Sequence, residues 1–293
     1  MTSGRFAFGV FGDGPYYPEE MERFNRVLED VKSSDVDWLV HIGDLLWNPC
    51  TDEALRERLR QLQSAERPLM YTPGDNEWTD THDEQIGGHD PLERLASIRK
   101  IFFCGQSLSI NGQTVTVDCQ SSDGRFADFC ENARWQHGGF VFATIHVVGS
   151  NNGKAPFLSR TSAHDHEVER RTQAAMHWLD EAFLVAAQES ARGVVLAMHA
   201  NIGLERDGSR GDGFDPILER LEENLSRYTR PVLIIHGDSH THRVDHPFRD
   251  RFGNSVENLT RLEAFGSPDI GWVRVVIDDG RVVEIEPRLM KRH

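Results

Sequence analysis

A short apolar run gives way to a polar, histidine-rich segment at VLIIHGDSHTH, residues 232–242. The first four residues are aliphatic, which is typical of a buried strand in a parallel sheet. A Gly-Asp pair and three histidines follow. Gly-Asp turns a chain sharply, and imidazoles bind transition metals. We therefore interpret this segment as a strand whose carboxyl end carries chemistry.

The same arrangement occurs at four other places in the chain. Each is a short apolar run followed within three residues by a Gly-Asp pair or a histidine. They are Phe6–Phe11 before Asp13, Trp38–Ile42 before Asp44, Leu69–Tyr71 before Asp75, and Val194–Met198 before His199. Ligands of open α/β sheets bind at the carboxyl ends of the strands. The five strand ends together predict one rim that carries both carboxylates and imidazoles.

Amphipathic stretches separate most of the apolar runs, and strand–helix alternation predicts an α/β fold. The expected helices are Glu20–Lys32, Glu167–Gln188 and Pro216–Tyr228. Further strands are expected at Phe140–Val148 and, as an antiparallel addition, at Leu259–Phe265, Trp272–Ile277 and Val282–Ile285. We expect a single domain over residues 1–293. Residues 79–139 fit the alternation worst, although they contain a helix pattern at Pro91–Phe102 and a hairpin signal around Asn111-Gly112. We interpret them as an insertion over one end of the sheet, with a separate small domain as the alternative.

The charge balance limits the class of partner. The chain has 32 Lys and Arg residues against 47 Asp and Glu residues, which gives a net charge of −15. Such a charge repels a phosphate backbone, so we expect no nucleic-acid partner. A small phosphorylated substrate remains compatible with it, because bound metal ions reverse the sign of the charge locally.

The sequence also predicts where the protein resides. No apolar run approaches the roughly 18 residues that a membrane span needs, so no membrane association is expected. Residues 1–5 lead directly into a strand-like run rather than a signal peptide. We expect a cytoplasmic protein, with a mature exported form as the alternative. Four cysteines are too few for a disulfide scaffold, although one bridge is open among Cys104, Cys119 and Cys130.

The order of these blocks resembles the calcineurin-like metallophosphoesterase superfamily. Its blocks are D-x-H or G-D-x-G, then G-D, G-N-H-[DE], a His and G-H-x-H. Here they read Gly-Asp, Gly-Asp, Gly-Asp-Asn-Glu, His and His-x-His, from Asp13 to His242. The first block is most similar to that of purple acid phosphatases. The resemblance implies a four-layer sandwich of two mixed β-sheets flanked by helices.

The resemblance also implies a metal-dependent phosphoesterase that hydrolyses phosphomonoesters or phosphodiesters. A hydroxide that bridges two metals would attack phosphorus in line. The implied cofactors are two divalent transition metals: Mn, Fe or Zn. The implied ligands are Asp13 and His242 for the first metal, Asp44 as the bridge, and Asp75, His199 and His240 for the second.

Two departures from the family concern the first metal. The histidine of D-x-H is Pro15 here, and the tyrosine that replaces it in purple acid phosphatases is Trp47. Neither side chain binds a metal. The first site therefore lacks one protein ligand by either pattern, and water, Tyr16 or Tyr17 are the alternatives that fill the position.

Two further departures concern the third block. Asp75 stands where the family has a neutral Asn ligand, which lowers the formal charge of the centre from +2 to +1. A register shifted by one, with Asn76 as the ligand, is the alternative. In the favoured register Asn76 replaces the catalytic histidine of the family, so we expect it to contact the leaving oxygen as both a catalytic and a substrate-binding residue. Asn151 is a second candidate donor to phosphate oxygens, with a simple turn as the alternative.

A different class of function is also open. Pro15, Trp47 and Asn76 are the features of a catalytically impaired module that binds metal or a phospholigand without turnover. The retained aspartates and histidines favour the hydrolase.

Overall fold

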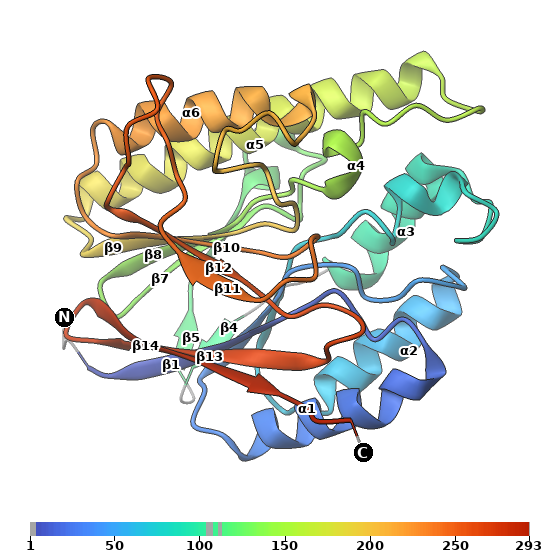
Figure 1. Cartoon of the computed structure of the whole chain (residues 1–293), viewed down its shortest axis with the longest axis horizontal. Coiled ribbons are helices and arrows are strands. Elements are labelled where there is room, and N and C mark those ends of the chain that lie inside the picture. Colours follow the sequence, from blue (N-terminus) through green and yellow to red (C-terminus); the bar gives the residue numbers. More distant parts are fainter. Residues whose placement is uncertain (1–3, 104–107, 111–112, 293) are drawn as a thin grey trace.

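The computed structural model describes residues 4–103, 108–110 and 113–292, and it contains two mixed β-sheets packed together (Figure 1). The first sheet has the order β14 (Arg281–Leu289), β13 (Gly271–Asp278), β1 (Phe6–Phe11), β2 (Trp38–His41) and β3 (Leu69–Tyr71). The second has the order β11 (Arg243–Asp245), β12 (Leu259–Glu263), β10 (Val232–His236), β9 (Gly193–Ala197), β8 (Phe140–Thr144), β7 (Ala133–His137) and β6 (Val117–Cys119).

Helices cover the outer face of each sheet (Figure 1). Helices α1 (Met21–Ser33), α2 (Asp52–Gln63) and α3 (Pro91–Phe102) pack on the first sheet through one apolar cluster. Helices α5 (Ser162–Gln188) and α6 (Asp215–Leu225) pack on the second through another. The predicted four-layer sandwich of two mixed sheets flanked by helices is thus confirmed.

Aromatic side chains fill the seam between the two sheets. The rings of Phe8 and Trp38 stack with their centroids 5.4 Å apart, and those of Trp135 and Phe142 stack at 5.3 Å. All four side chains are buried. Large rings that alternate with polar residues along a strand are what one sheet needs to pack on another.

The parallel strands place their carboxyl ends at one edge of the sandwich. Strands β1, β2 and β3 are parallel neighbours, with Phe11 opposite His41 and His41 opposite Tyr71. In the second sheet β8, β9, β10 and β12 are also parallel. The loops that follow these strands therefore emerge together.

Residues 79–139 are built into both halves of the molecule. Helix α3 packs against α2, while β6 and β7 extend the edge of the second sheet. The expected hairpin is formed by β4 (Leu108–Ile110) and β5 (Gln113–Val115), although Asn111-Gly112 itself lies outside the described residues. That this segment is an insertion relative to the family stays a prediction.

Two smaller expectations concern the membrane and the cysteines. Among the helices of the described residues, none combines the length and apolar character that a membrane crossing requires. Cys119 and Cys130 are free thiols, as is the buried Cys50. Cys104 lies outside the described residues.

Candidate metal centre

The loops after β1, β2, β3, β9 and β10 bring carboxylates and an imidazole together. Two overlapping groups of candidate ligand atoms each lie within 4.8 Å of one another. Asp13, Asp44 and His199 form one group, and Asp75, His199 and Asp238 form the other. Asp13, Asp44 and Asp75 follow strands of one sheet. His199 and Asp238 follow strands of the other. The centre therefore exists only when the two sheets have packed.

His199 lies in the middle of the cluster. Its Nε2 atom is 3.0 Å from Asp75 Oδ1, 3.5 Å from Asp44 Oδ1 and 3.9 Å from Asp238 Oδ1. Its Nδ1 atom lies 2.9 Å from the carbonyl oxygen of Ile42, which can only accept a hydrogen bond. The carbonyl holds one ring proton on Nδ1, so Nε2 is the atom that faces the carboxylates. Without a metal Nε2 is protonated and donates to Asp75, and a cation that displaces this proton would find a nitrogen ligand. A backbone partner of this kind is typical of metal-ligating histidines.

His240 lies beside the first group in the same manner. Its Nδ1 atom is 2.7 Å from the carbonyl oxygen of Ser267. Its Nε2 atom is 3.9 Å from Asp13 Oδ1 and 3.3 Å from the hydroxyl oxygen of Tyr16. The carbonyl again fixes the tautomer, so Nε2 is the atom presented to the cluster.

The backbone at the site is strained. Four cluster residues have left-handed backbone conformations, with φ of 50° at Asp13, 55° at Asp44, 70° at Asp238 and 58° at His240. Such conformations are rare outside glycine and cost on the order of 1–3 kcal/mol each. Each one redirects a side chain at a strand end, and the redirected side chains converge.

Two glycines let the backbone approach the carboxylates closely. A Cβ atom added at Gly237 would lie 1.9 Å from Asp13 Oδ2. One added at Gly149 would lie 2.3 Å from Asp75 Oδ2 and 2.6 Å from Asp238 Oδ1. Any larger residue would push the carboxylates apart, so both positions depend on glycine for space rather than only for conformational freedom.

Burial destabilises the negative charges of the cluster. Burial raises the pKa of Asp44 to about 7, and it is also the largest cause of the raised pKa values of Asp13, Asp75 and Asp238. Burial alone would lower the pKa of His199, but the Asp44 and Asp75 carboxylates outweigh it and raise that pKa well above its usual value. Without a counter-ion the site holds protons in place of cations.

The donor set fits a metal centre. The buried Oδ2 atom of Asp13 has no hydrogen-bond partner among the described residues. An unpartnered carboxylate oxygen in a buried acidic cluster is costly unless a cation binds it. Carboxylate oxygens and imidazole nitrogens are the ligands that Mn, Fe and Zn share.

We expect the metal-free protein to lose stability as pH rises. Groups whose pKa is raised on folding bind more protons in the folded state. Their stabilising contribution is full below the unfolded pKa and is lost as pH passes the folded pKa. For Asp44 this window runs from 3.8 to about 7. Mn²⁺ competes with these protons, so it should raise the melting temperature most at high pH, by about 5–10 °C at a hundredfold excess over Kd.

Melting temperatures between acidic and mildly alkaline pH, with and without Mn²⁺, test this expectation. The Asp75→Asn/Asp238→Asn double variant is the control, because it removes two of the buried carboxylates and leaves the rest of the chain unchanged. The melting temperature of the metal-free double variant should depend less on pH than that of the metal-free wild type. Identical pH dependence of the two proteins would contradict the electrostatic picture of the site.

The structure does not bring His242 into the cluster. Its ring stacks on Phe265 with centroids 4.4 Å apart, and its Nδ1 atom lies 2.8 Å from the carbonyl oxygen of Glu263. Within the described residues, no hydrogen bond or ion pair joins the His242 ring to a cluster carboxylate. The assignment therefore moves by two residues: His240 lies where His242 was expected, and Asp238 lies where His240 was expected.

Asp238 is the residue that the sequence interpretation missed. The family block G-H-x-H begins with glycine, and the glycine here is Gly237, followed by Asp238, Ser239 and His240. The literal His-x-His match at 240–242 lacks that glycine. The position of the glycine was thus a usable signal for the register in which the structure places Asp238 and His240 at the cluster.

Tyr16 lies at the first candidate metal site, for which neither Pro15 nor Trp47 can supply a ligand atom. Its hydroxyl donates to Asp44 Oδ2 at 2.8 Å. Burial, followed by the Asp44 and Asp13 charges, raises the pKa of Tyr16 well above 10. Of the three expected alternatives, Tyr16 is at the site as a neutral phenol, whereas Tyr17 is exposed. The ring of Trp47 lies 6.1 Å from that of Tyr16.

In the third block the structure places the carboxylate of Asp75 among the candidate ligand atoms. The Asp75 carboxylate lies in the cluster, while the backbone N–H of Asn76 donates to Asp44 Oδ1 at 3.1 Å. The Asn76 side chain is almost completely buried, and its amide makes no recorded hydrogen bond within the described residues. This side-chain amide, in the residue whose backbone N–H donates to Asp44, is available to a ligand.

Asn151 has a structural task. It lies in α4 (Gly149–Asn152), where its side-chain oxygen accepts from the Gly213 N–H at 2.8 Å and its amide donates to Asp212 at 3.2 Å. Both polar groups hold the loop against the residues before α6. The geometry therefore favours the turn alternative over contact with substrate.

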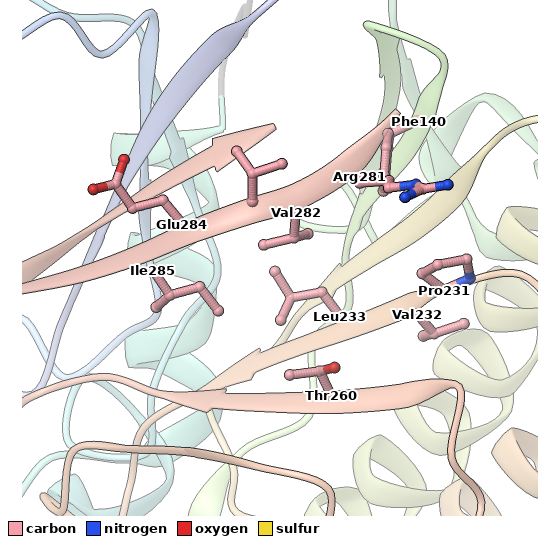
Figure 2. Close-up of a pocket in the computed structure, with 10 residues that line it drawn as sticks. Phe140, Pro231, Val232, Leu233, Thr260, Arg281, Val282, Glu284 and Ile285 are labelled. Atoms are coloured by element: carbon pink, nitrogen blue, oxygen red, sulfur yellow. The ribbon is translucent and has the colours of Figure 1, made fainter. Parts of the chain in front are cut away.

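A cavity of about 390 Å³ lies at the other end of the strands (Figure 2). It is bordered by the first residues of β8, β10 and β14 and is lined mainly by Phe140, Leu233, Val282 and Ile285. Its charged side chains, Arg281 and Glu284, belong to the edge strand β14. The cavity shares no residue with the metal-ligand cluster.

The sequence model for calcineurin-like phosphoesterases matches residues 8–242. This chain belongs to that family. The match begins in β1 and ends just after the cluster residues of the last block, so it covers every strand end that contributes to the centre. A search of curated proteins found no match.

Two solved structures are similar over nearly the whole chain. A purple acid phosphatase from yellow lupin (Lupinus luteus) seeds has a TM-score of 0.55 and 14% identity, covering 98% of this chain. This chain spans 54% of the lupin protein. The protein TT1561 of Thermus thermophilus has a TM-score of 0.49 and 10% identity, covering 98% of this chain and 99% of that one.

Proposed function

We propose that this protein is a metal-dependent phosphoesterase that hydrolyses phosphomonoesters or phosphodiesters. The observation that carries the proposal is the convergence of Asp13, Asp44, Asp75, His199 and Asp238 within the region that matches the family. Because the net charge of −15 disfavours nucleic acid, we propose a small phosphorylated molecule as the substrate.

We propose two divalent metals, Mn, Fe or Zn, held in two adjacent sites. Asp13, Asp44 and His240 would hold the first, and Asp44, Asp75, His199 and Asp238 the second. Compared with the family pattern, Asp75 and Asp238 replace an amide and an imidazole by harder carboxylate oxygens. That exchange favours Mn²⁺ or Fe²⁺ over Zn²⁺.

The side chains of the site divide the remaining work. When bound, such a metal pair lowers the pKa of water and neutralises charge on the attacking and leaving oxygens. Tyr16 donates to Asp44 and orients its carboxylate. The carbonyls of Ile42 and Ser267 hold the tautomers of His199 and His240. The amide of Asn76 would hydrogen-bond to the leaving oxygen.

A substitution series on the last block tests the proposal. The Mn²⁺-loaded protein should hydrolyse aryl phosphate mono- or diesters, measured by release of p-nitrophenol. Asp238→Asn and His240→Ala should each lower metal affinity and kcat/KM by at least roughly 10- to 100-fold. Removal of a residue that only supports a metal ligand has an effect of that size, and removal of a ligand itself should cost no less. His242→Ala is the matched control, and it should stay within about threefold of wild type because its ring lies outside the cluster.

The outcomes separate the two classes of function. Loss of activity in His242→Ala but not in His240→Ala would return the assignment to the literal His-x-His register. A wild-type protein that binds Mn²⁺ and phosphate but turns over no ester would support the catalytically impaired binding module, for which the replacement of a histidine by Asn76 is the main structural argument.

A further inference from the structure

Arg210 lies at the rim of the metal centre. One of its guanidinium nitrogens donates to Ser239 Oγ at 2.9 Å, and Ser239 lies between Asp238 and His240 in the chain. The Asn201 amide donates to the same oxygen at 2.6 Å. A Cβ atom added at Gly203 would lie 2.8 Å from Arg210 Cγ, so the stem of the arginine rests on the Gly203 backbone.

Unlike its neighbours, Arg210 forms no ion pair with any residue that the structure describes. Arg206 on the same loop pairs with Glu222 at 2.9 Å, and Lys154 pairs with Asp212 at 2.9 Å. Within the described residues, no carboxylate lies within the 4.0 Å ion-pair distance of the Arg210 guanidinium. Its side chain is exposed to solvent. Arg210 therefore makes no direct ion pair, and its guanidinium keeps N–H groups that can donate to a ligand.

The number of carboxylates at the centre makes a positive charge at its rim important for binding an anion. Four aspartates, Asp13, Asp44, Asp75 and Asp238, would balance two divalent cations and leave a formal charge of zero. The three carboxylates expected from the sequence would leave +1. A phosphomonoester dianion therefore finds less attraction at this centre, and a cation at the rim restores it.

We propose that Arg210 binds the non-bridging oxygens of a terminal phosphoryl group and makes the site selective for phosphomonoester dianions over diesters. This inference rests on the proposed phosphoesterase function. A planar guanidinium can donate two parallel hydrogen bonds to a phosphoryl group that has three free oxygens. A diester offers only two free oxygens and one negative charge, so it gains less from the same contact.

The experiment compares two substrates with one leaving group: p-nitrophenyl phosphate and methyl p-nitrophenyl phosphate. In the Mn²⁺-loaded protein, Arg210→Gln should lower kcat/KM for the monoester by about 10- to 100-fold, mainly through KM, and change the diester by less than about threefold. The kcat/KM of Arg210→Lys for the monoester should fall between the values of wild type and Arg210→Gln. Lysine keeps the positive charge but cannot donate two parallel hydrogen bonds from a planar group. Ser209→Ala, next to it on the same loop, is the control and should match wild type.

Binding of inorganic phosphate separates this inference from the proposed function. Titration calorimetry on the Mn²⁺-loaded protein should show phosphate affinity lowered by Arg210→Gln about as much as monoester kcat/KM. If wild type turns over neither ester but Arg210→Gln still weakens phosphate binding, the hydrolase proposal fails and the Arg210 assignment stands. Equal losses for both esters, or unchanged phosphate affinity, would overturn the Arg210 assignment.

Discussion

Asp44→Asn is expected to abolish hydrolysis and, at the same time, to make the metal-free protein more stable. Asp44 is the carboxylate shared between the two proposed metal sites. Loss of the metal pair removes several kcal/mol of transition-state stabilisation, which corresponds to about 10³-fold or more in kcat/KM. Bound Mn²⁺, measured on the purified variant, should fall in parallel.

The gain in stability has a separate physical cause. Burial raises the pKa of Asp44 to about 7, so above that pH the metal-free fold contains a buried anion whose burial cost the nearby His199 charge offsets only in part. An asparagine removes the charge and keeps the contacts: its oxygen can accept from the Asn76 N–H, and its amide can donate to the Tyr16 oxygen. We expect the free energy of unfolding of the metal-free variant at pH 8 to rise by about 1–3 kcal/mol.

Asp128→Asn is the matched control, because Asp128 is exposed and distant in sequence from all five strand ends. It should change neither activity nor melting temperature. An Asp44→Asn protein that keeps full turnover and metal content would refute the two-metal proposal. Lower stability of the metal-free variant would show that Asp44 is a structural residue rather than a ligand held under strain.

Most of the fold could be predicted because the apolar residues of this chain follow the periodicities of strands and helices. Strands β1 and β3 and helix α3 have the expected boundaries. The apolar run from Phe140 was expected to remain a strand as far as Val148, but β8 ends at Thr144. Ile145, Val147 and Val148 lie beyond the end of the strand and are still buried, in the apolar clusters between the sheets and the helices. Apolar runs report burial first and strand pairing only second.

Helix α2 was not predicted although its sequence carries helix signals. Thr51 caps it by accepting from the Ala54 N–H, and Asp52 and Glu53 lie in the first turn. Only Leu55 and Leu62 are buried apolar residues along its twelve positions. The charged side chains that cover the rest of the helix hide its narrow apolar stripe from a search based on hydrophobic periodicity.

The expected candidate ligands come together in the structure where a strand end positions them, and they do not where the backbone turns. His240 and His242 would face the same side only in an extended segment, in which residues two apart share a side. The structure instead places Asp238 at φ 70° and His240 at φ 58°. These left-handed residues bend the segment, so the alternation rule does not apply and His242 turns toward Phe265. Local backbone strain of this kind has no simple sequence signature beyond a run of Gly, Asp and Ser.

Asn76→His is expected to change how the rate depends on the leaving group. A positioned imidazolium contributes about 10²–10⁴-fold by protonating the leaving oxygen. The Asn76 amide can donate a hydrogen bond but cannot release a proton near neutral pH. Rates of the wild type should therefore rise steeply with the acidity of the leaving phenol, so that p-nitrophenyl esters react well and simple alkyl esters poorly.

The measurement is a series of substituted phenyl phosphates assayed on wild type, Asn76→His and Asn76→Ala, with chemistry as the slow step. Asn76→His should flatten the dependence, accelerate the poorest leaving groups by about 10- to 100-fold and add a decline in kcat above the pKa of the new imidazole. Asn76→Ala separates proton donation from hydrogen bonding: it should keep the steep slope and lower all rates together. Because the Asn76 side chain is almost fully buried, the melting temperature of each variant must first show that the larger ring is accommodated. A shallow slope already present in the wild type would mean that another group supplies the proton, and Tyr16, which lies between Asp44 and His240, would be the next residue to substitute.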